Sequence, residues 1–443
     1  MTLDDDTRQL LDGRGILPSW LLALLPAAAE PPSVTEVLKR LDAAGIEVID
    51  HAMLAEPEME QAHWELSLDL RLADGQLVEG IGVWTEPTES LDEAHLDWQG
   101  MTADDIALAK ASRWCLGVSE HFGERPLDDF HRQVRMLAAV APDAVAFLDL
   151  IACFPRPARW MSEVASQAVP PSPENLYCIH AVADESSDGE PTGGVWLHTH
   201  GLLRCGSIEL EILDVPPSAV PEMGTLLNTT AGLFLDHGIP EPGEVFEVGA
   251  GLRLAWLPWR RGLSGVSRRA LGHLADRDEL HARPSGILVA PRGRRWFWPF
   301  PGGWTSPCRY TTRLGDNPAL YVSTMETERR CLLAQATLDR FGSLFERYGD
   351  DEAWGFLIKL GYPVDEGDDG EREHLWFEVH QLDDDGLDAT LLNDPHHIAD
   401  LHRGDRRRHT LDRVTEWTVF SPHGRHGPDS VVYLEEALSA ADA

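Results

Sequence analysis

The segment with the clearest capacity for chemistry contains His198 and His200, with two acidic residues shortly after it. On an extended strand, residues two apart point to the same face, so the two imidazoles would lie side by side. Imidazole nitrogens and carboxylate oxygens are common ligands of zinc and of iron(II). The spacing therefore predicts a candidate site for Zn or Fe, with the potential ligands His198, His200, Glu209 and Glu211.

A second explanation for this histidine pair needs no metal. No third strong ligand stands at a fixed offset, and His180 on the preceding predicted strand would lie close only in one strand register. The pattern His-x-His also arises by chance in a chain with 19 histidines. In this explanation, which the sequence favours, both side chains hydrogen-bond to backbone or carboxylate groups near a turn. Cys205 would need a nearby base to act as a nucleophile, and we expect a small buried residue there.

Common catalytic signatures are missing from the sequence. It contains no GxGxxG, no Walker A motif and no HExxH, and residues 262–265 do not fit the GxSxG nucleophile turn. Nucleotide enzymes and hydrolases of the familiar kinds are therefore not indicated.

The elements that would position the histidines are short strands alternating with helices. Period-two and apolar runs predict strands at Trp64–Leu72, Ala144–Phe154, Leu176–Val182, Gly194–His200, Glu209–Leu213 and Leu252–Trp256. Capping residues and helical spacing predict helices that begin at Ser33, that run from Thr102 to Glu120 and from Val220 to His237, and that extend from Ser323 to Tyr348. This pattern predicts an α+β fold of mixed helices and mostly antiparallel sheets.

A chain of 443 residues is too long for one ordinary core. We expect an N-terminal α+β domain at 1–155 and a central α+β domain at 156–315 that carries the histidine pair and packs with the first. A small C-terminal domain at 316–443 would combine a helix with a curved sheet.

The composition has a large excess of negative charge, with a formal net charge of −37. Such a charge repels nucleic acid and anionic lipid and attracts basic partners.

Six scattered cysteines without a CxxC pair, and no signal peptide or membrane-spanning run, predict a cytoplasmic protein. Two acidic turns and a basic, aromatic stretch supply candidate contacts to a protein partner: Asp365, Glu366, Asp368, Asp369, Asp383, Asp384, Asp385, Arg260, Arg261, Trp296 and Trp298.

Two segments resemble uncharacterised bacterial families. The residues Glu-His-Leu-Trp-Phe-Glu-Val at 373–379 and Leu-Leu-Asn-Asp-Pro at 391–395 resemble the YegJ-like family. The residues His-Thr-His-Gly-Leu at 198–202, with Cys-Gly at 205–206 and Glu-Leu-Glu-Ile-Leu at 209–213, resemble a second family found upstream of such domains. The resemblance implies no catalytic residues, but similar domains occur among immunity proteins of bacterial toxin systems.

The hypothesis that follows from charge and resemblance is a non-catalytic acidic protein of the immunity type, which binds a toxin or another basic protein and needs no cofactor. The alternative is a metal-dependent enzyme centred on His198 and His200.

Overall fold

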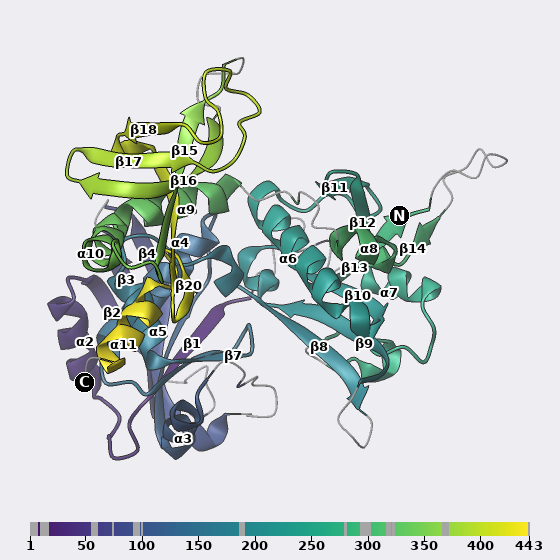
Figure 1. Ribbon diagram of the computed structural model, residues 1–443. Coiled ribbons are helices and arrows are strands. Elements are labelled where there is room, and N and C mark those ends of the chain that lie inside the picture. Colours follow the sequence, from purple (N-terminus) through teal and green to yellow (C-terminus); the bar gives the residue numbers. More distant parts are fainter. Residues whose placement is uncertain are drawn as a thin grey trace. The chain divides into compact units, whose positions relative to one another are not determined.

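The computed structural model describes residues 8, 17–54, 61–72, 75–91, 98, 101–185, 191–278, 281–292, 303–315, 320, 324–365 and 372–441. The chain divides into two compact units (Figure 1). Unit 1 comprises Met1–Ser166 and Pro173–Ser323, and unit 2 comprises Gln167–Ser172 and Thr324–Ala443. Three mostly antiparallel sheets with interspersed helices make the protein an α+β protein, as the sequence predicts.

The first sheet of unit 1 has the strand order β2-β3-β4-β5-β1-β6-β7, with antiparallel neighbours throughout. Its strands are β1 (Ser19–Leu24), β2 (Glu47–Met53), β3 (Trp64–Arg71), β4 (Leu77–Pro87), β5 (Trp114–Glu120), β6 (Ala146–Asp149) and β7 (Phe154–Pro157). Its helices are α2 (Val34–Ala43), α3 (Ala103–Ala111), α4 (Pro126–Val140) and α5 (Ala158–Ser166). Helix α4 packs its apolar face against β1 and β5.

The predicted helix from Thr102 to Glu120 is wrong in its second half. The predicted cap is present, because Thr102 and Asp105 form a capping box, but α3 ends at Ala111 and β5 follows. The reason is tertiary, because β5 fills the gap between β1 and β4. Gly117 is required there, since a Cβ atom at this position would lie 2.2 Å from the Trp84 ring.

The predicted strand Ala144–Phe154 is also two elements. Strand β6 stops at Asp149, whose Oδ1 accepts hydrogen bonds from the backbone N–H groups of Ile151 and Ala152. The chain turns there and returns as β7. A continuous apolar run does not reveal this turn, because β6 and the turn residues 151–153 are buried alike.

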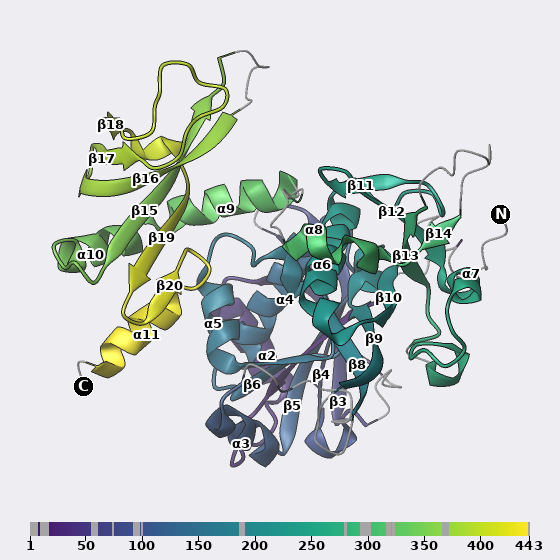
Figure 2. The same cartoon turned by 45° about the vertical axis from the view of Figure 1, so that its right-hand side comes forward.

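The second sheet of unit 1 has the order β11-β12-β13-β10-β9-β8, and β14 pairs with β13. Its strands are β8 (Cys178–Glu185), β9 (Pro191–His200), β10 (Glu209–Val215), β11 (Phe246–Gly249), β12 (Leu252–Pro258), β13 (Ser285–Pro291) and β14 (Trp304–Thr305). Strands β10 and β13 are parallel, while the other pairs are antiparallel. Helix α6 (Val220–His237) lies along β8, β9 and β10 (Figures 1 and 2), and the short helices α7 (Trp259–Gly262) and α8 (Thr311–Gly315) complete this part.

A buried ion pair connects the two sheets of unit 1. Arg204 follows β9 and has a fully buried side chain. Its guanidinium donates to both carboxylate oxygens of Asp149, at 2.9 and 2.7 Å, to Ser19 Oγ at 2.9 Å and to the carbonyl of Leu176 at 2.7 Å. Because Asp149 ends β6 and Ser19 begins β1, this one side chain ties the first sheet to the turn after β9.

The described residues of unit 2 form a sheet of order β18-β17-β16-β15-β19-β20 and three α-helices. The elements are α9 (Thr324–Ala336), α10 (Leu338–Tyr348), β15 (Gly355–Pro363), β16 (Arg372–Asp383), β17 (Gly386–Leu391), β18 (Arg406–His409), β19 (Val414–Ser421), β20 (Gly424–His426) and α11 (Val431–Ala441).

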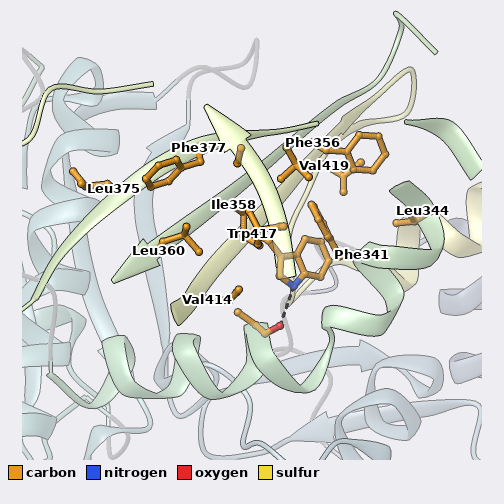
Figure 3. Packing of buried hydrophobic residues seen from close by; sticks show 14 of the residues in the cluster. Phe341, Leu344, Phe356, Ile358, Leu360, Leu375, Phe377, Val414, Trp417 and Val419 are labelled. Atoms are coloured by element: carbon orange, nitrogen blue, oxygen red, sulfur yellow. Dashed lines mark hydrogen bonds between the residues drawn. The ribbon is translucent and has the colours of Figure 1, made fainter. Parts of the chain in front are cut away.

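The predicted single helix from Ser323 to Tyr348 is two helices that meet at Thr337. The buried Trp417 ring of β19 lies at this junction, packed against Phe341 (Figure 3). Its indole N–H lies 3.2 Å from both the carbonyl of Ala334 and the hydroxyl of Thr337. The break lets both helices pack against the same tryptophan. This contact joins residues far apart in the sequence, so helical spacing alone does not predict it.

Among the described residues, no helix has both the length and the apolar character needed to cross a membrane. All six cysteines are free thiols.

Candidate metal centre

Four histidine side chains meet on one face of the second sheet. His198 and His200 share a face of β9, and His180 on β8 is directly opposite His198 in the antiparallel register. The fourth, His281, comes from the segment that precedes β13. The register of β8 against β9, which the sequence does not determine, therefore places His180 beside His198 and His200. The tertiary fold adds His281, which is 81 positions beyond His200.

The reactive nitrogens of these rings are close together. His198 Nε2 lies 3.1 Å from His200 Nε2 and 3.3 Å from His281 Nε2. The candidate ligand nitrogens of His180, His198 and His200 all lie within 4.8 Å of one another. Zinc–nitrogen bonds of about 2.0–2.1 Å in a tetrahedron separate the nitrogens by about 3.3 Å, and the distances from His198 to His200 and to His281 match this value.

The hydrogen bonds around His281 direct a lone pair into this cluster. Asp278 Oδ1 lies 2.8 Å from His281 Nδ1 and also accepts the His281 backbone N–H at 2.9 Å. A proton on Nδ1 leaves Nε2 unprotonated in the neutral ring, and Nε2 faces His198. A carboxylate that orients an imidazole in this way is a regular feature of metal sites.

The central imidazoles are held in the neutral form that binds metals. Burial, with the neighbouring histidine His200, lowers the pKa of His198 well below its usual value. Burial, with the neighbouring His180 and His281, lowers the pKa of His200 to about 3. The two side chains are only 2% and 5% exposed. Buried His198 Nδ1 has no hydrogen-bond partner among the residues that the structure describes, so its ring is not explained as a satisfied core histidine.

Glu211 positions the segment that carries His281. Its carboxylate makes a two-point ion pair with Arg277, at 3.0 and 2.6 Å, and accepts hydrogen bonds from Trp196 and Ser285. Arg277 in turn donates to the carbonyl oxygens of His281 at 2.9 Å and of Gly272 at 3.0 Å. The Glu211–Arg277 pair thus fixes the backbone from which the His281 ring projects.

Glu209 orders the turn that follows His200. Its carboxylate accepts hydrogen bonds from Thr199 Oγ1 at 2.7 Å and from the backbone N–H groups of Gly201 and Leu203, at 2.9 and 3.2 Å. Burial raises its pKa in spite of these bonds. Glu209 and Glu211, the two predicted acidic ligands, therefore line the site, but their oxygens are bonded to other groups. His180 and His281 are the further candidate ligands beside His198 and His200.

The space beside the cluster is small. A cavity of about 20 Å³ is lined by Trp196, His198, Thr199, His200, Glu209, Glu211, His281, Arg283 and Ser285. This volume accommodates about one water-sized species.

Cys205 lies on the 3₁₀ turn Leu202–Cys205, where burial raises the pKa of its thiol to about 12, so the thiol is not activated as a nucleophile.

The predicted partner-binding residues lie elsewhere. Asp383, Asp384 and Asp385 form the exposed turn between β16 and β17, and Asp383 pairs with Arg408. Asp365 accepts the backbone N–H of Ala399. Arg260 and Arg261 lie on α7, where Arg260 stacks on Trp259. The remaining candidates fall outside the described residues: Glu366, Asp368, Asp369, Trp296 and Trp298.

Sequence reasoning missed His281 and the strand β13 that follows it. The only local signal was Asp278 three residues before His281, a spacing common in acidic chains. Arg283 was missed for the same reason, since it reaches the cluster only because β13 inserts beside β10.

The comparisons with known proteins match domains without an assigned function. Residues 19–171 match the N-terminal model of DUF4026, a protein of unknown function, and residues 179–289 match the C-terminal model of the same family. Residues 334–443 match DUF2314, described as an uncharacterized protein conserved in bacteria. No curated protein and no solved structure matches the sequence. All four clustered histidines lie within the segment that matches the C-terminal model of DUF4026, and the chain is thus similar to DUF4026 over residues 19–171 and 179–289 and to DUF2314 over residues 334–443.

Proposed function

We propose that unit 1 binds one divalent transition-metal ion, zinc or iron(II), through the histidine cluster and acts as a metal-dependent enzyme. The observation that supports this most strongly is the position of His198 Nε2, which lies 3.1 Å from His200 Nε2 and 3.3 Å from His281 Nε2. His180, on the edge strand β8, lies close enough to His198 and His200 to be a further ligand. A metal held by imidazoles acts as a Lewis acid and lowers the pKa of bound water, and that is the chemistry it would supply here.

Elemental analysis of protein purified without chelators tests the proposal. We expect about one equivalent of zinc or iron in the wild type and none in the double variant His198→Ala/His200→Ala, because both central ligands are then lost. A double variant at two exposed histidines of unit 2, His396→Ala/His397→Ala, serves as the matched control and should keep the full metal content. A wild-type protein that remains metal-free after incubation with zinc and with iron(II) would refute the proposal.

The Asp278 carboxylate gives a graded prediction. Replacing Asp278 with alanine should weaken metal binding about 10–100-fold without abolishing it, because His281 loses the acceptor that orients its ring. Competition with a chelator of known affinity measures the change. Asp276→Asn is the control, since that exposed carboxylate is not bonded to any described histidine of the cluster. An equal loss in both variants would contradict the positioning role of Asp278.

The recognition of a basic protein partner, the immunity role, the YegJ-like assignment of the C-terminal domain and the cytoplasmic location stay predictions from the sequence. They rest on the net charge of −37 and on the resemblance of segments. The exposed turn Asp383–Asp385 is the described surface on which partner contact can be tested, by co-purification at low salt with and without charge reversal of that turn.

A further inference from the structure

We infer that the metal centre takes a ligand or substrate carrying an oxyanion group, a carboxylate or a phosphate, and that Arg283 holds this group beside the metal. The inference rests on the proposed metal function and names the class of molecule that the site accepts. It starts from an arginine that lines the same cavity as His198, His200 and His281.

Arg283 differs from the two buried arginines near the cluster, Arg204 and Arg277, in making no ion pair with a described residue. The guanidinium groups of Arg204 and Arg277 each make a two-point ion pair with a buried carboxylate. Arg283 is half-buried, yet no hydrogen bond or ion pair joins its side chain to any residue that the structure describes. Part of this guanidinium is withdrawn from water, so an oxyanion that compensates its charge would stabilise it there.

The two carboxylates in the cavity wall cannot fill that role in this structure. Glu211 is fully used by Arg277, Ser285 and Trp196. Glu209 is used by Thr199 and by the backbone N–H groups of the turn after His200. Neither carboxylate forms an ion pair with Arg283 among the described residues, so its N–H donors are available to a group that enters from outside.

Metal loading strengthens this preference for an anion. Neutral histidines leave the full charge of a divalent ion uncompensated, and Arg283 lines the same cavity as these histidines. Carboxylates and phosphates present two or more oxygens, so one can coordinate a metal while another accepts a hydrogen bond from the planar guanidinium. The cavity of about 20 Å³ holds about one water-sized group, so a single oxygen of such a molecule would enter it and the remainder would stay outside.

Cobalt(II) substitution makes the inference measurable. The visible spectrum of Co²⁺ reports its ligands, so the full chain is loaded with Co²⁺ and titrated separately with inorganic phosphate and with acetate. We expect a saturable spectral change with at least one of them. Arg283→Gln should raise that dissociation constant about 10–100-fold, because a charge-assisted hydrogen bond is lost, whereas Arg283→Lys should give an intermediate value. Arg253→Gln, at an exposed position of β12, should match the wild type.

The outcomes separate the two proposals. Failure of the wild type to bind Co²⁺ refutes the metal centre itself. Binding of Co²⁺ with a spectrum that neither anion changes refutes the oxyanion inference and leaves the metal centre standing. Unchanged anion affinity in Arg283→Gln also refutes the inference, because the anion would then be held without the guanidinium. A response to phosphate alone or to acetate alone identifies which oxyanion the site prefers.

Discussion

Replacing Arg204 with methionine is expected to lower the free energy of unfolding of unit 1 by about 3–5 kcal/mol. The substitution leaves Asp149 buried without its counter-ion, although that carboxylate is only 3% exposed. It also removes the hydrogen bonds to Ser19 Oγ and to the carbonyl of Leu176. The loss should appear as faster amide hydrogen exchange in β1 and β6, a local measurement that separates unit 1 from unit 2.

A double-mutant cycle shows whether the ion pair is the cause. The variant Arg204→Met/Asp149→Asn removes both charges and should be less destabilised than the sum of the two single variants, because no unpaired buried charge remains. The exposed pair of Arg71 and Glu47 is the matched control, with side chains 47% and 60% exposed. Arg71→Met should cost less than about 1 kcal/mol. A similarly small cost for Arg204→Met would contradict the role of this side chain in joining the two sheets.

Metal binding is expected to stabilise unit 1 by about 4 kcal/mol when free zinc exceeds its dissociation constant 1,000-fold. The reason is that the four histidines come from β8, β9 and the segment before β13, so an unfolded chain cannot present them together. Urea unfolding with zinc and with a chelator measures the difference, again with hydrogen exchange used to assign it to unit 1.

The matched variants decide whether this stabilisation comes from the cluster. The difference between zinc and chelator should vanish in His198→Ala/His200→Ala and should persist in the unit 2 control His396→Ala/His397→Ala. Equal stabilisation of both variants would show that zinc acts at another site, and no stabilisation of the wild type would argue against the cluster as a metal centre.

Local rules predicted many elements of this protein because they depend on near neighbours in the chain. Ser33 caps α2 by accepting the N–H of Glu36, and the alternation at Trp64–Leu72 becomes β3. The failures occurred where distant contacts override local preference. Trp114–Glu120 joins the sheet between β1 and β4 instead of extending a helix, and Trp417 separates α9 from α10 at Thr337.

The candidate site shows the same division. The sequence by itself determined that His198 and His200 share one face of a strand, since side chains alternate along β9. Only the tertiary structure decided which groups join them. Strand pairing places His180 opposite His198. The ion pair of Glu211 with Arg277 holds His281 near the other histidines. The carboxylate of Glu209 binds the backbone after His200. The physical reason is that a metal site requires ligand atoms to meet at one point in space. For His198 and His281, which are 83 positions apart, this depends on strand register and on buried ion pairs, and residue spacing in the sequence contains neither.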